Sequence, residues 1–179
     1  MINVFEVLKK ENVSAKNQQV FDEIKRVFGA VPNLYSTLAY SENALDAYFK
    51  LEISPNSLTV KETEAINLVV SEINNCMYCL SAHTMIAKQS GFTEEETIRI
   101  RSGNAPFDIK LDTLVKLTRE LSENRHIENP ALLDAFFEAG YTKENLMDII
   151  ILIGDRTISN MLHAVTKVPI EFSLTKVLD

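Results

Sequence analysis

The feature that most constrains this chain is a cluster of reactive side chains within residues 59–91. Cys76 and Cys79, the two cysteines of the protein, stand three residues apart, and His83 follows four residues later. In a helix that begins at Cys76, these three positions lie within roughly 60° of one another around the axis. The spacing therefore predicts two thiols and one imidazole on a single helix face.

The residues before the cysteines indicate that a helix begins there. Asn74 and Asn75 interrupt the apolar pattern of the preceding segment, and asparagine is a favoured N-cap residue. The positive end of a helix stabilises a thiolate over a thiol. An imidazole one turn after Cys79 can accept or return a proton near neutral pH. The local pattern thus predicts chemistry at a thiol, with His83 in proton transfer.

Glu64 is the fourth candidate. It stands twelve residues before Cys76, and on one unbroken helix it would point about 120° away from that thiol. A break at the asparagine pair removes this constraint, because two separate helices can bring the carboxylate back to His83. A carboxylate placed there orients the ring, as in a catalytic triad. The alternative is a solvated carboxylate in the first turn of its own helix.

Two other interpretations of the cysteines stay open on the sequence. Cysteines often pack as small hydrophobic residues in a core. Cys76, Cys79 and His83 also supply three ligands of the kinds that zinc prefers, and Glu64 is a candidate fourth ligand. Structural zinc sites, however, usually draw ligand pairs from two separated segments, and the chain has no second cysteine pair. We expect no metal and no cofactor, and keep a zinc-binding scaffold as an alternative.

The order of glutamate, eleven residues, Cys-x-x-Cys, three residues and histidine resembles the active-site pattern of the alkylhydroperoxidase D (AhpD) family. This family lies within the carboxymuconolactone decarboxylase-like superfamily. Residues 31–50, 91–105 and 160–169 resemble its peroxidase-related branch, so the resemblance covers most of the chain from Val31 onward. It implies an all-α fold, an AhpD-like orthogonal helical bundle.

A single domain over residues 1–179 is also the default for a chain of this length. We divide it into a helical N-terminal extension over 1–55, active-site helices over 59–91 and C-terminal helices over 93–179. The chain has only five glycines and five prolines, and this small number argues against an all-β fold with its many turns. Residues 143–163 loosely mirror residues 61–83, which suggests a degenerate internal repeat without thiols.

Two sequence signals predict details of these helices. Thr59 with Glu62, and Thr93 with Glu96, have the spacing of capping boxes, which begin helices. The run of aliphatic residues at 149–153 is apolar on every side of a helix. It predicts a helix buried all round, in the centre of a bundle or at a subunit interface.

The resemblance implies a role for each site residue. Cys79 would attack a hydroperoxide and become a sulfenic acid, and Cys76 would resolve it to a disulfide. His83 and Glu64 would relay protons. The implied partners are a small-molecule hydroperoxide and an external dithiol reductant, for which a lipoylated protein is the candidate, and the implied assembly is a homo-oligomer. We therefore expect an enzyme, a peroxiredoxin-type alkylhydroperoxide reductase.

One position departs from the family pattern. The best-known members carry a histidine directly before the second cysteine, where this chain has Tyr78. A thiol–disulfide redox adaptor or sensor without significant peroxidase activity is therefore the alternative function. The carboxymuconolactone decarboxylases proper lack the cysteine pair, which argues against lactone decarboxylation.

Charge and hydropathy narrow the partners further. A net charge of −7 gives no general attraction for nucleic-acid phosphates or anionic membranes, and we find no basic patch. The first residues show no cationic leader with a long apolar run, and no segment approaches the roughly 20 apolar residues of a membrane span. We expect a cytoplasmic protein without nucleic-acid or membrane partners, in which a Cys-x-x-Cys pair is redox-active.

Overall fold

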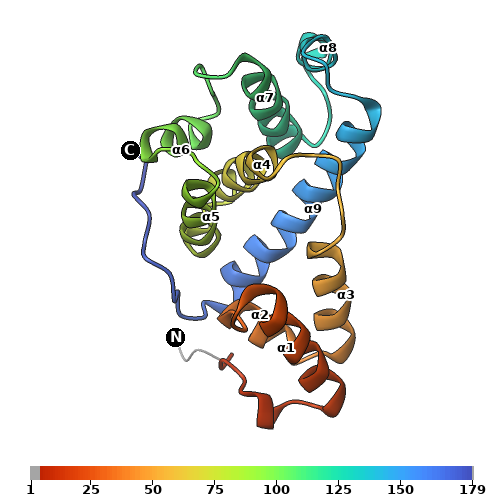
Figure 1. Cartoon of the computed structure of the whole chain (residues 1–179), viewed down its shortest axis with the longest axis vertical. Coiled ribbons are helices and arrows are strands. Elements are labelled where there is room, and N and C mark those ends of the chain that lie inside the picture. The colour runs from red at the N-terminus through yellow and green to blue at the C-terminus, as the bar shows by residue number, and fades with distance from the viewer. Residues whose placement is uncertain (1–4, 179) are drawn as a thin grey trace. The chain divides into compact units, whose positions relative to one another are not determined.

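The regular structure of this protein is entirely helical over residues 5–178, the part of the chain that the computed structural model describes (Figure 1). The predicted all-α class is therefore confirmed. The chain divides into two compact units, and each is described by itself. The assignment of residues 1–179 to one domain with three parts remains a prediction.

The first unit comprises the chain up to Pro55 together with Met161–Glu171. Its elements are the 3-10 helix η1 (Lys10–Asn12) and the helices α1 (Ala15–Phe28), α2 (Asn33–Leu38) and α3 (Glu42–Glu52). Aliphatic and aromatic side chains of α1 to α3 and the α2–α3 turn form its core: Val20, Phe21, Ile24, Tyr35, Ala39, Leu45, Tyr48 and Phe49. None of the four predicted site residues lies in this unit.

The second unit comprises Asn56–Asn160 and the chain from Phe172 onward. Its helices are α4 (Val60–Ile73), α5 (Met77–Gln89), α6 (Glu94–Arg101), α7 (Ile109–Asn124), α8 (Pro130–Glu138) and most of α9 (Lys143–Thr166). Helix α4 is central, because it contacts α5, α6 and α7 (Figure 1). Its middle, from Glu64 to Ser71, is buried throughout, and the carboxylate of Glu64 is therefore held inside the unit.

Local side-chain contacts explain where two of these helices begin. The Thr59 hydroxyl accepts from the Glu62 N–H at 3.2 Å, and the Glu62 carboxylate accepts from the Thr59 N–H at 2.8 Å. Thr93 and Glu96 repeat the arrangement at the start of α6. Both predicted capping boxes are therefore confirmed. The first of them sets the register of α4 and so the direction in which Glu64 points.

The turn between α4 and α5 differs from the predicted one. Asn74 is the C-cap residue of α4, and Asn75 has a left-handed backbone with a φ of 52°. The Asn75 N–H donates to the Glu72 carbonyl at 3.0 Å, and the Cys76 N–H donates to the Ser71 carbonyl at 2.9 Å. These two bonds close α4 as a Schellman motif. The prediction that an asparagine caps α5 is therefore wrong, and Cys76 itself is the N-cap residue.

Helix α9 is less buried than its apolar run predicts. Ile149 is fully buried, but Met147, Ile150, Ile151 and Ile158 are between 46% and 54% exposed. These exposed residues share one side of the helix, while the core of the second unit covers another side. The prediction of burial on every side within a bundle is therefore wrong for the single chain. A subunit interface at this stripe remains a prediction.

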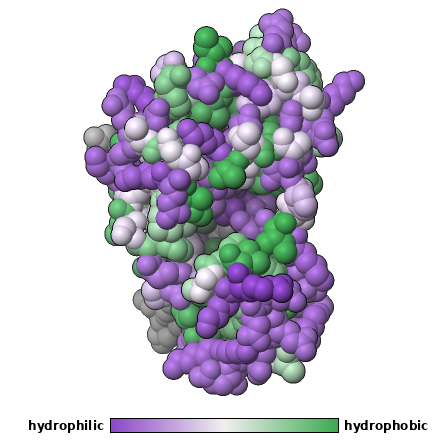
Figure 2. Space-filling view, in the orientation of Figure 1, coloured by the Kyte–Doolittle hydropathy of each residue, from purple (hydrophilic) through white to green (hydrophobic). Residues whose placement is uncertain are grey.

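Figure 2 shows the hydropathy of one face of the molecule. On the face shown in Figure 2, hydrophilic side chains predominate and hydrophobic ones form small separate patches. None of the helices among the described residues combines the length and the hydropathy that a bilayer crossing requires.

The left-handed residue in the α4–α5 turn makes a testable prediction. Replacing Asn75 with valine should lower the free energy of unfolding by about 1–2 kcal/mol, because a β-branched residue is strained at positive φ. Asn75→Gly is the matched control, since glycine adopts this backbone without a penalty. Urea unfolding followed by circular dichroism measures both variants. Equal stability of the two variants would show that this residue does not constrain the turn.

Candidate active site

Helix α5 carries both thiols and the imidazole at its N-terminal end. Cys76 is the N-cap residue, Cys79 lies in the first turn, and His83 lies one turn later. All three are buried, and Cys79 is only 1% exposed. The site is therefore shielded from bulk solvent, in surroundings where hydrogen bonds and charges act strongly on a thiol.

Glu64 reaches His83 from α4. Its Oε2 lies 2.8 Å from Nδ1 of the imidazole, and both side chains are buried. The Schellman turn makes this contact possible, because it ends α4 and lets α5 pack beside it (Figure 1). A proton on Nδ1 directed at the carboxylate leaves Nε2 as the nitrogen that can exchange a proton with other groups.

The two thiols interact directly and differ in acidity. A hydrogen bond from Cys76 is the largest influence on Cys79, and it lowers the pKa of Cys79 from the ordinary 9.0 to about 5. Burial opposes this shift, while the positive charge of Arg156 and the imidazole of His83 add to it. The same contact with Cys79, together with burial, raises the pKa of Cys76. At neutral pH the pair therefore consists of a Cys79 thiolate and a Cys76 thiol.

The carboxylate of Glu64 belongs to a longer buried network that the sequence analysis missed. Asn67, one turn along α4, donates to Glu64 Oε1 at 3.1 Å. Arg156 on α9 donates from Nε to Asn67 Oδ1 at 3.0 Å and from Nη2 to Asp155 Oδ2 at 3.2 Å. Glu64 thus accepts from His83 with one oxygen and from Asn67 with the other, which fixes the plane of the carboxylate.

The same helix α9 brings two further polar side chains to the thiol region. Ser159 Oγ lies 3.7 Å from Cys79 Sγ, and it accepts from Arg156 Nη1 at 3.2 Å. Asn160 donates to the Ser71 hydroxyl at 3.3 Å, and it is one of the groups that act on Cys76. The buried network therefore connects the imidazole and the thiolate by a second path, through α4 and α9.

A partial signal for these residues exists in the sequence. Asp155 and Arg156 form a charged pair directly after the apolar run of α9, and charged residues are rarely buried without a partner. This pattern indicates a buried polar contact in α9. It does not identify the partner, because 80 residues separate Ser159 from Cys79 along the chain.

Metal binding by the described residues can be tested against the geometry. Among residues 5–178, no group of three or more histidine, cysteine, aspartate or glutamate side chains stands where it could hold a metal ion. The Glu64 carboxylate is directed at the imidazole and at the Asn67 amide.

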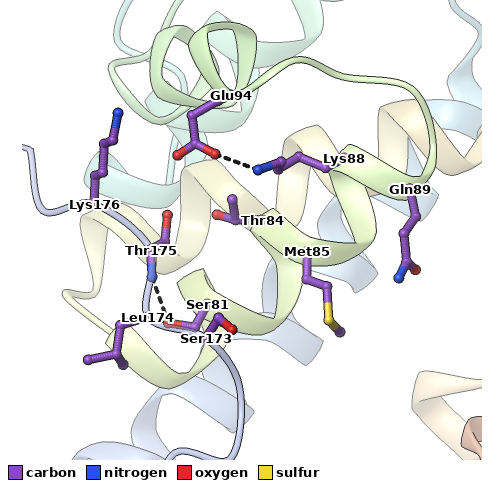
Figure 3. Close-up of a pocket in the computed structure, with 10 residues that line it drawn as sticks. All are labelled: Ser81, Thr84, Met85, Lys88, Gln89, Glu94, Ser173, Leu174, Thr175 and Lys176. Carbon is purple, nitrogen blue, oxygen red and sulfur yellow. Dashed lines mark hydrogen bonds and ion pairs between the residues drawn. The ribbon is translucent and has the colours of Figure 1, made fainter.

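A cavity of about 680 Å³ lies on another side of α5, beside the start of α6 and residues 173–176 (Figure 3). Its lining includes the ion pair of Lys88 with Glu94 at 2.8 Å. The Thr175 N–H donates to the Ser81 hydroxyl at 3.3 Å and holds the C-terminal segment along the helix. Neither cysteine lines this cavity, so it is not part of the thiol site.

Tyr78 occupies the position at which the sequence departs from the family pattern. Its side chain is buried, and its ring packs edge-to-face on Phe172 with the ring centroids 5.4 Å apart. The ring thus serves as a packing surface for the C-terminal segment.

One family model matches the segment that carries these residues. Residues 40–108, which contain Glu64 and the thiol motif, match the carboxymuconolactone decarboxylase family. No curated protein matches the chain.

Several solved structures share the fold. An uncharacterized peroxidase-related protein from Silicibacter sp. TM1040 is 21% identical with a TM-score of 0.78, over 93% of this chain and 89% of that chain. An alkylhydroperoxidase AhpD core protein, also peroxidase-related, from Ralstonia eutropha JMP134 is 23% identical with a TM-score of 0.79, over 92% and 90%. The debrominase Bmp8, in a cysteine-to-alanine variant bound to 2,3,4-tribromopyrrole, is 18% identical with a TM-score of 0.77, over 96% and 93%.

These likenesses confirm the predicted fold, and the family match lies on the segment that carries the thiols. The chain therefore has the fold of the AhpD-like structures, and the match to the carboxymuconolactone decarboxylase family extends over residues 40–108.

Proposed function

We propose that this protein is a thiol-dependent peroxidase that reduces organic hydroperoxides with Cys79 as the nucleophile. The observation that carries the proposal is the hydrogen bond between two buried thiols, of which Cys79 has a lowered pKa and Cys76 a raised one. A thiolate is the reactive form of cysteine, and a neighbouring thiol can supply a proton and then a second sulfur. The likeness to peroxidase-related proteins agrees with this class of chemistry.

In the first step, the Cys79 thiolate attacks the terminal oxygen of the hydroperoxide. The S–O bond forms as the O–O bond breaks, so the sulfur is oxidised to a sulfenic acid and the peroxide is reduced to an alkoxide. The alkoxide takes the proton of Cys76, the thiol that is hydrogen bonded to the attacking sulfur. An alcohol leaves, and Cys76 is now a thiolate.

In the second step, Cys76 attacks the sulfur of the sulfenic acid and a disulfide forms. His83 takes a proton from solvent and, as an imidazolium that Glu64 stabilises, gives it from Nε2 to the departing hydroxide, which leaves as water. An external dithiol must then reduce the disulfide. A lipoylated protein in the cytoplasm is our candidate donor, from the family resemblance.

The catalytic unit of this proposal is a homo-oligomer. The exposed stripe of α9, with Met147, Ile150 and Ile151, is the apolar surface that we assign to the contact between subunits. Exposed apolar residues that share one helix side are typical of such contacts.

The first functional prediction concerns the disulfide. One equivalent of a small organic hydroperoxide should convert wild-type protein to a species two mass units lighter, with Cys76 and Cys79 joined, as peptide mass spectrometry would show. Cys79→Ser should not react, and Cys76→Ser should stop at a sulfenic acid that a specific trapping reagent labels. If folded wild-type protein keeps both thiols while the unfolded chain is oxidised, Cys79 is not a peroxide nucleophile.

The second functional prediction concerns how the oxidation rate of Cys79 depends on pH. Because the pKa of Cys79 is lowered to about 5, the sulfur is charged throughout the neutral range. The rate of single-turnover oxidation should be nearly constant between about pH 6 and 8, and should fall about tenfold per unit as the pH drops below 5. Stopped-flow measurement of the rate across this range tests it. A rate that instead keeps rising toward pH 9 would indicate an ordinary thiol.

The third functional prediction concerns the role of Glu64 in proton transfer. Glu64→Gln keeps the shape of the side chain but removes the charge that supports an imidazolium. It should slow disulfide formation by roughly 10²-fold, the usual contribution of a general acid or base. The matched control is Glu72→Gln, which should keep the wild-type rate. Glu72 is a partly exposed carboxylate on the same helix, and it pairs with Arg101. Equal rates for the two variants would remove Glu64 from the relay.

Organohalides are a second candidate substrate class, because the likeness to the debrominase Bmp8 favours them. A thiolate can take the bromine as the C–Br bond breaks and the carbon takes a proton, and attack of the second sulfur then releases bromide and forms the same disulfide. Release of bromide from a brominated pyrrole without peroxide consumption would favour dehalogenation. Fast disulfide exchange with neither substrate consumed would favour the redox adaptor.

A further inference from the structure

We propose that two residues of α9 complete the thiol site: Ser159 as a catalytic residue that donates a hydrogen bond to ionised Cys79, and Arg156 as the positioning residue that holds Ser159. Neither belongs to the motif of α4 and α5. The inference deepens the proposed function, since it takes Cys79 as the nucleophile.

The hydrogen bonds of Ser159 depend on the state of the sulfur. Its Oγ lies 3.7 Å from Cys79 Sγ and 2.9 Å from the Arg156 carbonyl, and both side chains are 1% exposed. A hydroxyl has a single hydrogen, so it cannot donate to both partners. While Cys79 is a thiol, its S–H donates to Oγ and the hydroxyl donates to the carbonyl. Once the sulfur is ionised, the hydroxyl turns toward it and makes a stronger, charge-assisted bond.

Arg156 prepares the hydroxyl for this role. Its Nη1 donates to Ser159 Oγ at 3.2 Å, while its Nε is held by Asn67 Oδ1 at 3.0 Å. A guanidinium only donates, so it occupies a lone pair of the oxygen and polarises the hydroxyl as a donor. Its positive charge also lies behind the hydroxyl in a buried site, where attraction to a thiolate is poorly screened.

Two carboxylates in the same network carry the opposite charge to Arg156. Asp155 accepts from Arg156 Nη2 and offsets part of the guanidinium charge. Glu64 is a second negative group, but it lies behind the imidazole of His83. Helix α9 therefore lowers the pKa of Cys79 in two ways, through the charge of Arg156 and through the directed hydrogen bond from Ser159.

The test is a pH titration of the ultraviolet absorbance of the thiolate in the folded, reduced protein. Cys76 stays protonated in the acidic range, so the first ionisation is that of Cys79. Ser159→Ala should raise the pKa of Cys79 by about one unit, because a hydrogen bond to a charged group is lost. Ser159→Thr keeps the hydroxyl and should restore the low pKa. Arg156→Lys should shift it upward by a smaller amount.

Two matched controls separate this role from general packing. Thr157→Ala removes a hydroxyl from the same helix that bonds only the Ile153 carbonyl, at 2.7 Å. Arg101→Lys changes an arginine that is equally buried but pairs with Glu72. Both controls should titrate as the wild type does.

A folded Ser159→Ala variant whose first ionisation coincides with that of the wild type would overturn the inference, and so would equal shifts in Ser159→Ala and Thr157→Ala. If Arg156→Lys does not fold, the comparison of Ser159→Ala with Ser159→Thr still decides the result. The titration needs no substrate. Failure of the peroxidase proposal would therefore appear in the oxidation assay and leave this measurement intact.

Discussion

The contact between the Cys76 thiol and the Cys79 sulfur is the interaction on which the rest of this site depends. It is the largest influence on the acidity of both groups, and it acts in opposite directions on them. In the proposed peroxidase, this difference makes one cysteine the nucleophile and the other the proton donor. Arg156, His83 and Ser159 also act on Cys79 and lower its pKa, so the negative charge is favoured on that sulfur.

The charged groups of this buried site need polar partners. Glu64, Asp155 and Arg156 carry charge inside the second unit, and an unpaired charge there would cost several kcal/mol. Asn67 and Ser159 form hydrogen bonds with these groups, so that each charged group has polar partners. A network of this kind holds its members in one geometry, which a reaction between neighbouring sulfur atoms requires.

Much of the fold was predictable because its signals are local. Capping boxes act over three residues, and helical spacing places Cys76, Cys79 and His83 on one helix without knowledge of the tertiary structure. The approach of Glu64 to His83 followed from expecting a break at the asparagine pair. The cap was misassigned there, because asparagine favours both a helix start and the left-handed residue that ends a helix. Ser159 and Arg156 depend on how α9 packs beside α4 and α5, which no local pattern encodes. The exposed stripe of α9 depends on packing in the same way.

The near-complete enclosure of Cys79 sets a limit on how the molecule can exchange electrons. A small oxidant can diffuse to a sulfur that is 1% exposed during brief fluctuations, but the thiol of a bulky donor cannot. In the proposed cycle, reduction of the disulfide by such a donor therefore requires the beginning of α5 to open. The opening rate of this segment would then limit turnover. The rate of disulfide reduction would saturate at high donor concentration even with an unlimited supply of oxidant.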